Sequence, residues 1–251
     1  MLRIAHLETS INIGGQELRI LDQIQWLLNK GHSAWLLACE NSAIYEEATR
    51  RGIPAHPVPF RGSVNPHAVS ELVGFIKREK VNLLDCHSSG AISTAVMARM
   101  LGIPVVRTLH VQTFKTDLIH KYLWRYGIDH VIVVSQGIGD KLVGLGFADR
   151  DKISVIPTGV DLNRFRPEVD GSSVRREFDI PESTKVISEI AMIRPDKGQK
   201  YFIRAVDRVV SAWPDVRFLI VGFATKPEFF QEIKEEIATG VIACYLASGE
   251  V

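Results

Sequence analysis

The stretch that decides the fold is VIVVSQGIGDKLVGLGFADRDKISVIPTGVDLNRFRP, residues 131–167. It contains two short β-branched runs separated by a helical pattern, which is the order of one strand–helix–strand unit. The first run ends in a bare Ser135, and the second ends in PTGVD, residues 157–161. After PTGVD the chain changes character and becomes rich in turn-forming and charged residues.

The same alternation of short β-rich runs and amphipathic segments extends back from this stretch to the N-terminus. It runs almost without interruption from LRIAHLE, residues 2–8, to KISVIP, residues 152–157. Strands that alternate with helices imply parallel strands joined by right-handed crossovers, so we predict a doubly wound, Rossmann-like α/β sheet. The first helix is expected to bury one face made of Leu18, Leu21, Ile24, Leu27 and Leu28 and to stop at Gly31.

The turn-rich segment 157–173 indicates a hinge between two domains. The alternation restarts with KVISEIAMI, residues 185–193, so we predict an N-terminal domain over 1–167 and a second Rossmann-like domain over 168–251. The second domain contains only two clear strands in sequence. The tail TGVIACYLASGEV, residues 239–251, is expected to form neither a strand nor a helix.

Composition favours a soluble globular protein, because 46% of the 251 residues are apolar and 24% are charged. The net charge of +1 gives no general field for nucleic acid, so no nucleic-acid partner is expected. Cys39, Cys86 and Cys244 have no metal-ligand or C-x-x-C spacing, which favours a reduced, cytoplasmic setting. The polar residues within MLRIAHLETS, residues 1–10, argue against a signal peptide, and no apolar run is long enough to span a membrane.

Ligands of open α/β sheets bind at the carboxyl ends of the strands, so the residues after each strand are the candidates. At the first such end, INIGGQE (residues 11–17) contains Gly14 and Gly15, which allow the backbone to approach a ligand closely. The free amides that open the next helix suit an anion or sugar hydroxyls. The alternative is a turn that serves only geometry. The dinucleotide pattern G-x-G-x-x-G is absent, which disfavours a dehydrogenase.

Two histidines follow neighbouring predicted strands, His87 in DCHSSG (residues 85–90) and His110 in RTLHVQT (residues 107–113). A lone histidine is more often structural than catalytic, but two at adjacent strand ends favour a site. Ser88 and Ser89 are expected to cap the helix that follows. The sequence has neither a Ser-His-Asp order with a nucleophile elbow nor a zinc-ligand spacing of its histidines.

In the second domain, AMIRPDKGQK (residues 191–200) places Arg194 and Lys197 beside the start of a helix. Two cations near a helix N-terminus can bind a diphosphate through charge-assisted hydrogen bonds. The alternative is a solvated pair of basic residues in a turn. Gly222, which closes FLIVG, would let a second loop approach the same ligand.

The order of these motifs resembles the retaining glycosyltransferases of family four, which have the GT-B fold, over about residues 2–238. The opening stretch carries the most specific part of the resemblance, because it resembles that family's hinge segment. On this reading Ser135 begins the last helix before the crossing strand, and PTGVD leads into the donor domain. Asp161 and Phe165 stand where the family has the Asp and Phe of this motif, whereas Thr158 replaces a more usual Asn.

The resemblance implies a role for each candidate residue in transfer of a sugar from a nucleotide-sugar, with retention of configuration and no divalent metal or other cofactor. Gly14 and Gly15 match the loop that approaches the donor phosphate and the acceptor, and His110 matches the histidine that hydrogen-bonds the transferred sugar. Lys197 matches the lysine that holds the donor diphosphate. Glu17 matches the acid after the glycine loop, where a capping role is equally plausible.

Arg194, Lys197 and the amides of Gly14 and Gly15 would stabilise the leaving diphosphate, while His110 orients the sugar. Donor or acceptor contacts are further expected from the residues Glu17, His87 and Gly222. Arg194 is a substitute for the family's arginine, which stands where this chain has Met192.

The chain also ends before the paired glutamates and the final helix that the family uses to hold the donor. We therefore expect little or no transferase activity from the 251 residues, and a frameshift or premature stop is one explanation.

The segment FKTDLIHKYLWRYG, residues 114–127, interleaves basic and aromatic side chains in the way of a helix that rests on an anionic membrane surface. A packed helix with solvated basic residues explains the pattern equally well. On the membrane reading the acceptor is a saccharide or a lipid-linked sugar in cell-envelope glycan synthesis, at the inner face of the membrane. Two other functions stay open, namely a non-catalytic module that binds nucleotide-sugars and a nucleotide-sugar epimerase of similar fold.

Overall fold

The computed structural model describes residues 1–60, 65–111, 114–224, 226–238 and 244–247. The chain divides into two compact units, Met1–Val160 and Asp161–Val251, each with its own parallel sheet. The division falls inside PTGVD, in the turn-rich segment that follows the last strand of the first unit.

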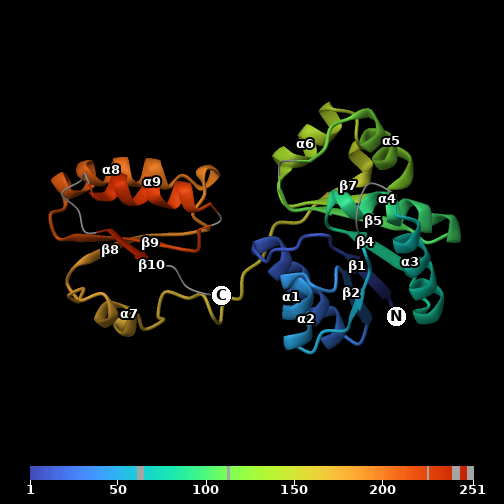
Figure 1. The fold of residues 1–251 in the computed structure, drawn as a ribbon, viewed down its shortest axis with the longest axis horizontal. Coiled ribbons are helices and arrows are strands. Elements are labelled where there is room, and N and C mark those ends of the chain that lie inside the picture. Colours follow the sequence, from blue (N-terminus) through green and yellow to red (C-terminus); the bar gives the residue numbers. More distant parts are fainter. Residues whose placement is uncertain (61–64, 112–113, 225, 239–243, 248–251) are drawn as a thin grey trace. The chain divides into compact units, whose positions relative to one another are not determined.

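Seven parallel strands form the sheet of the first unit, in the order β3-β2-β1-β4-β5-β6-β7 (Figure 1). The strands are β1 (Arg3–Leu7), β2 (Ser33–Ala38), β3 (Ala55–Pro57), β4 (Leu83–Cys86), β5 (Val105–Leu109), β6 (His130–Val133) and β7 (Ile153–Val155). The order reverses between β1 and β4, which makes the carboxyl ends of these two strands the place where a ligand site is expected.

Helices cover both faces of this sheet. They are α1 (Gly15–Asn29), α2 (Ala43–Arg50), α3 (Pro66–Glu79), α4 (Ser89–Ala98), α5 (Leu118–Gly127) and α6 (Gln136–Gly144). Successive residues of a strand point to opposite faces. Accordingly Ile4 and Leu36 join the core under α1 and α2, whereas Ala5 and Leu37 join the core that contains side chains of α3, α4, α5 and α6.

The buried face of α1 includes Ile20 in addition to the expected Leu21, Ile24 and Leu27, whereas Leu28 is partly buried and Leu18 is exposed. The fully buried residues are Ile20, Leu21 and Ile24, with Leu27 close to them at 7% exposure. Leu18 is 38% exposed, because it lies on the far side of the stripe that these residues define.

The hinge region follows the sequence pattern of the opening stretch. Ser135 is the N-cap residue of α6, and β7 is the strand that follows this helix. From Pro157 to the start of α7 (Ser172–Glu177) the chain forms no helix or strand. The Oδ1 of Asp161 accepts a hydrogen bond from the amide of Asn163 at 2.9 Å, which is a local turn that begins the second unit.

The second unit contains three parallel strands in the order β10-β9-β8, namely β8 (Lys185–Ile190), β9 (Val216–Val221) and β10 (Cys244–Ala247). Helices α8 (Gln199–Ala212) and α9 (Pro227–Ala238) lie on one face of it (Figure 1). The expectation that the tail forms no strand is wrong, since β10 pairs with β9. The strand β9 is therefore the central strand of this sheet, paired with β8 on one side and β10 on the other.

No helix within the described ranges is both long and apolar enough to cross a bilayer.

Candidate functional site

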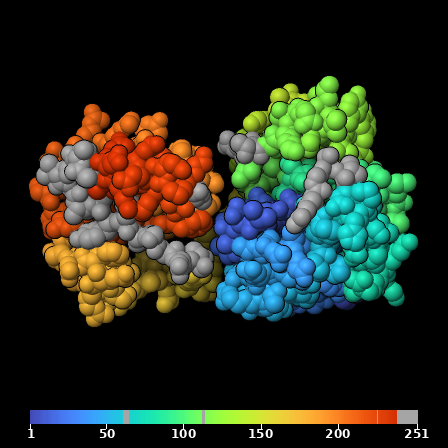
Figure 2. Space-filling model, in the orientation of Figure 1, coloured from blue at the N-terminus to red at the C-terminus, as the bar shows by residue number. Residues whose placement is uncertain are grey.

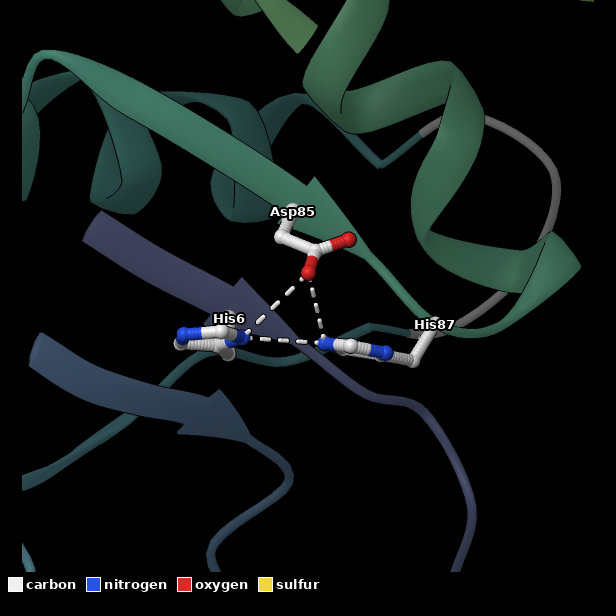
Figure 3. Close-up of side chains that lie close together, drawn as sticks. All are labelled: His6, Asp85 and His87. Atoms are coloured by element: carbon white, nitrogen blue, oxygen red, sulfur yellow. Dashed lines mark hydrogen bonds and ion pairs between the residues drawn. The ribbon is translucent and has the colours of Figure 1, made fainter. Parts of the chain in front are cut away.

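Three histidines from the ends of three neighbouring strands form a line at the carboxyl edge of the first sheet. His6 lies in β1, and His87 and His110 directly follow β4 and β5. The Nδ1 of His6 lies 3.0 Å from the Nε2 of His87, and the Nδ1 of His87 lies 3.0 Å from the Nε2 of His110. Figure 3 shows His6 and His87 end to end, with Asp85 of β4 beside the gap between their rings. The two histidines expected from sequence are therefore brought together, and a third joins them.

Asp85 holds a fixed position beside this line. Its Oδ2 lies 3.6 Å from the Nδ1 of His6 and 3.5 Å from the Nε2 of His87 (Figure 3). Its Oδ1 accepts a hydrogen bond of 2.8 Å from the hydroxyl of Thr108 in β5. The carboxylate is thus anchored on one side and faces two imidazole nitrogens on the other.

Burial sets the charge of these groups. Desolvation lowers the pKa of His6 and of His110 to about 3, and it lowers the pKa of His87 well below 6.5. Desolvation also raises the pKa of Asp85 to about 6. At neutral pH the three rings are therefore neutral and Asp85 is ionised.

The residues His6, Asp85 and His87 are the one group of three potential metal ligands that the described part of the chain contains. The rings of His6 and His87 are nearly coplanar, at 15°, and their centroids lie 5.3 Å apart. This separation equals the 3.0 Å between the nitrogens plus roughly the two ring radii, so the nitrogens face each other head-on. A shared metal ion would need both rings turned towards a point beside that line, so the geometry is that of an N–H···N hydrogen bond.

Two arginines place positive charge around the line. Arg107 is buried, donates from Nη1 to the carbonyls of Cys86 and Thr108, and packs over Trp124 at 5.5 Å. Arg19 of α1 donates one hydrogen bond to the carbonyl of Ile156 at 3.1 Å and another to the hydroxyl of Thr158, at the beginning of the hinge. Both cations add to the lowering of the pKa of His110, after desolvation.

The partner of Arg19 in the hinge is Thr158, whose hydroxyl lies 2.9 Å from the Nη1 of Arg19. The position that departs from the family's usual Asn therefore still carries an oxygen that accepts a hydrogen bond from α1.

The glycine loop lies between β1 and α1. Gly14 is the N-cap residue of α1 and provides no side chain to cap the helix, so the first amides of α1 remain available to a ligand. Gly15 is exposed, and a Cβ added to it would meet no atom within 4 Å.

A buried carboxylate organises this loop. The Oε1 of Glu8 accepts hydrogen bonds from the amides of Thr9 and Ser10 at 2.6 and 2.8 Å, and its Oε2 accepts one from the Nε2 of Gln16 at 2.7 Å. Desolvation raises the pKa of Glu8, although these hydrogen bonds act in the opposite direction and lower it. Glu17, predicted as a site residue, is buried in the first turn of α1, and its side chain makes no hydrogen bond within the described residues.

Serine stands at the start of α4 as expected, but it does not cap the helix through its side chain. Ser88 is the N-cap residue, but its hydroxyl makes no cap bond and instead accepts hydrogen bonds from the amide and the hydroxyl of Thr9 at 3.0 and 2.9 Å. The glycine loop and the start of α4 are therefore tied to each other through Thr9. Ser89 is the first residue of α4.

The basic pair of the second unit lies where the sequence predicted it, in a short 3₁₀ turn before α8. Lys197 is exposed and forms no ion pair with any described residue. Arg194 is half-buried, and its Nε lies 2.8 Å from the Oδ1 of Asp196 without hydrogen-bond geometry. Gly198, at φ 93°, ends the turn in the left-handed region that favours glycine.

Gly222 has a structural reason to be glycine. A Cβ added there would lie 1.8 Å from the carbonyl oxygen of Ala191, in the segment that follows β8. Backbone bonds on either side, from Ala191 to Val221 and from Ile193 to Phe223, hold the two segments together. The predicted close approach is therefore made to the neighbouring backbone, and contact with a ligand stays a prediction.

The segment 114–127 divides between core and surface. The helix α5 begins only at Leu118, because the side chain of Asp117 caps it by accepting a hydrogen bond from the amide of His120. Phe114 and Trp124 pack on each other at 5.7 Å inside the core, so they do not belong to a membrane-facing surface as the sequence suggested.

The exposed apolar side chains of this region line a groove of about 720 Å³ between α5 and the end of α4. They include Met100, Leu118, Ile119, Tyr122 and Tyr126, and the partly buried Val96 also lines the groove. In the view of Figure 2 the green atoms of this region lie at the molecular surface.

The structure thus adds four buried polar residues to the site that sequence reasoning missed, namely His6, Glu8, Asp85 and Arg107. For the three of them that lie within strands, His6, Asp85 and Arg107, the sequence carries one signal. Strands of a parallel sheet that are covered on both faces read as apolar runs, so a charged or imidazole side chain within one of them marks a site.

Comparison with known proteins identifies the family and the fold. The sequence model of the family described as Glycosyltransferase Family 4 matches residues 13–164. A D-inositol 3-phosphate glycosyltransferase of Segniliparus rotundus is 30% identical over 203 residues, which cover 69% of this chain and 45% of that protein. The UDP-Gal:alpha-D-GlcNAc-diphosphoundecaprenol alpha-1,3-galactosyltransferase of Escherichia coli is 25% identical over 240 residues, or 88% of this chain and 62% of that protein. The chain therefore spans less than two thirds of the length of these relatives.

Solved structures show the same architecture. Anabaena HepE in complex with UDP-glucose superposes with a TM-score of 0.81 at 20% identity, over 100% of this chain and 70% of that one. A UDP-GlcNAc 2-epimerase from Neisseria meningitidis bound to UDP-GlcNAc gives a TM-score of 0.64 at 13% identity, over 100% and 73% of the two chains. At these identities the likeness shows the GT-B fold alone. Because the family match covers most of the first unit, including the glycine loop, His87, His110 and the hinge, the chain belongs to glycosyltransferase family 4.

Proposed function

We propose that the protein transfers a sugar from a nucleotide-sugar to a saccharide or lipid-linked acceptor, with retention of configuration. The observation that carries the proposal is His110, a neutral imidazole at the carboxyl edge of the sheet, in line with His87 and His6. This proposal includes the retention of configuration, the identity of the acceptor and the role of each residue.

In this mechanism the bond between the sugar and the diphosphate breaks, so positive charge grows on the sugar ring and negative charge on the leaving oxygens. Lys197 and the amides of Gly14 and Gly15 would stabilise the leaving diphosphate. Loss of one such donor typically lowers the rate by about a hundred- to a thousandfold. His110 would hydrogen-bond a hydroxyl of the transferred sugar and orient it. His87 contributes through His110, and Glu17 and Gly222 remain proposed contacts.

Within the basic pair, Lys197 is the stronger candidate for the diphosphate. The charge of Arg194 is already opposed by Asp196, which lies 2.8 Å away, so Arg194 must exchange that partner for the ligand. Lys197 is exposed and has no such competitor among the described residues.

The relatives indicate which donor to test first. HepE was solved with UDP-glucose, and the name of the Escherichia coli relative specifies a UDP-galactose donor and a diphosphoundecaprenol-linked acceptor. UDP-glucose and UDP-galactose are therefore the first donors to offer this chain, and an undecaprenyl-linked sugar is the first acceptor.

The groove between α4 and α5 supports a lipid-linked acceptor in cell-envelope synthesis at the inner face of the membrane. Leu118 and Ile119 are 73% and 72% exposed, and Tyr122 and Tyr126 are 63% and 65% exposed. Apolar side chains with tyrosines among basic residues suit the boundary between lipid headgroups and acyl chains.

Flotation with vesicles of phosphatidylcholine, with and without phosphatidylglycerol, tests this surface. We expect binding that needs the anionic lipid and that Leu118→Glu abolishes. Leu162→Glu is the matched control, because Leu162 is also 73% exposed but lies in the hinge region. Equal flotation of the two variants, or flotation that ignores the anionic lipid, would remove the membrane from the proposal.

Calorimetric titration with UDP-glucose tests the donor. Charge-assisted hydrogen bonds to a ligand contribute about 1.5 to 3 kcal/mol, so Lys197→Ala should weaken binding by roughly ten- to a hundredfold. Lys200→Ala is the matched control, since the Nζ of Lys200 is held by Glu232 at 2.7 Å. Equal binding by both variants would contradict the assignment of Lys197.

Product analysis with and without an acceptor separates the alternatives. Transfer requires the acceptor, an epimerase converts the nucleotide-sugar alone, and a binding module leaves it unchanged. The expectation of little or no turnover by the 251 residues stays a prediction that the same assay tests.

A further inference from the structure

The line of three neutral imidazoles allows only two proton arrangements, one for each direction of the hydrogen bonds along it. Each neutral ring carries one N–H and one bare nitrogen. Two ring nitrogens that face each other at 3.0 Å need one proton between them, and both junctions in the line have this separation. The direction of the first hydrogen bond therefore fixes the direction of the second.

The closed end of the line indicates which direction is adopted. The Nε2 of His6 is buried and has no hydrogen-bond partner among the described residues. Orphaned buried N–H groups are rarer in proteins than acceptors with an unused lone pair. His6 is therefore better accommodated with its proton on Nδ1, where it donates to the Nε2 of His87.

Asp85 stabilises the proton at this junction in either direction, because its Oδ2 lies within 3.6 Å of both nitrogens and an ionised carboxylate stabilises an N–H dipole that lies beside it. The direction therefore follows from the Nε2 of His6. With the Nε2 of His87 acting as acceptor, His87 holds its own proton on Nδ1 and donates to the Nε2 of His110. The proton of His110 is then on Nδ1.

We propose that His6, Asp85 and His87 are positioning residues that hold His110 in its Nδ1–H tautomer, so that His110 presents a hydrogen-bond donor to an oxygen of the transferred sugar. This inference rests on the proposed function for the identity of the ligand, but the tautomer itself belongs to the free protein. A donor at this position requires an acceptor oxygen on the sugar, so a sugar that lacks that hydroxyl would lose the contact.

The test is a long-range proton–nitrogen NMR spectrum of the histidine-labelled chain without ligand. The wild-type spectrum should show His110 protonated at Nδ1 and bare at Nε2. In His87→Asn the amide nitrogen occupies the place of the Nδ1 of His87 and can still donate, so His110 should keep this tautomer. In His87→Leu the donor is lost, and His110 should shift towards the Nε2–H form.

Two results would overturn the proposal: an Nε2–H form of His110 in the wild type, or the same tautomer in His87→Leu as in the wild type. Should His87→Leu fail to fold, the pair His6→Asn and His6→Leu gives the same comparison one step further along the line. None of these spectra requires a substrate, so they decide the tautomer even if the chain binds no nucleotide-sugar.

Binding connects the tautomer to the ligand. A neutral hydrogen bond contributes about 1 kcal/mol, so His87→Leu should bind UDP-glucose about fivefold more weakly than the wild type and UDP equally well. His87→Asn should restore the wild-type affinity for UDP-glucose. An equal loss for UDP and UDP-glucose would indicate a merely structural role, whereas no binding of either ligand by the wild type would count against the proposed function.

Discussion

Mild acid should destabilise the first unit through its buried histidines. The pKa of His6 and of His110 lies at about 3 in the folded chain, and that of His87 is also well below 6.5. As the pH falls below 6.5, the unfolded chain binds protons that the folded chain does not, so the free energy of unfolding falls. Each histidine lowers it by up to about 1.4 kcal/mol per pH unit.

Asp85 acts in the opposite direction. Because burial raises its pKa to about 6, the folded chain takes up this proton before the unfolded chain does as the pH falls from 6 towards 4. This proton uptake offsets the contribution of about one histidine to the pH dependence of the free energy of unfolding. Glu8, whose pKa is also raised, offsets part of the contribution of another. We therefore expect the free energy of unfolding to fall by up to about 3 kcal/mol per pH unit below pH 6.

Urea unfolding between pH 7 and pH 5 measures this slope. A Trp213→Phe background removes the tryptophan of the second unit, so that the remaining fluorescence comes from Trp26, Trp35 and Trp124 of the first unit. In this background His110→Asn should reduce the slope by up to about 1.4 kcal/mol per pH unit. A free energy of unfolding that stays constant over this range, or a slope that His110→Asn leaves unchanged, would refute the reasoning.

Three further substitutions test the glycines and the basic pair. Gly222→Ala should lower the stability of the second unit by about 1 to 3 kcal/mol in thermal unfolding, because its Cβ meets the carbonyl of Ala191, and unchanged stability would contradict this. Gly15→Ala should leave the melting temperature equal or higher, since the added Cβ has free space, yet weaken UDP-glucose binding in calorimetry; unaltered binding would argue against close approach of the donor. Asp196→Asn should tighten UDP binding by up to about fivefold, because it releases Arg194, and weaker binding would mean that the ion pair organises the site.

The architecture could be predicted from sequence because each element carries its own periodic signal. The alternation of β-branched runs and amphipathic segments gave parallel sheets, and the positions of His87, His110, Arg194 and Lys197 follow from the rule that ligands meet strand ends. These predictions need only the order of the elements along the chain.

Whether an individual side chain points into the core or towards solvent depends on tertiary packing, so it could not be predicted in the same way. Trp124 belongs to the segment predicted to rest on a membrane surface but fills the core, whereas Leu118 in the same segment is exposed. His6 was missed as a site residue because its role appears only when β1 lies beside β4, where it pairs with Asp85 in the strand register. The strand β10 likewise becomes apparent only in the fold, where it pairs with β9.

The central claim is that His110 contacts the sugar of a nucleotide-sugar donor at the carboxyl edge of the first sheet. Titration of the histidine-labelled chain with UDP-glucose, followed at the imidazole nitrogens of His110, tests this contact directly. We expect a saturable shift of the His110 signals with UDP-glucose and a much smaller shift with UDP. Saturable binding of UDP-glucose that leaves the His110 signals unmoved would contradict it.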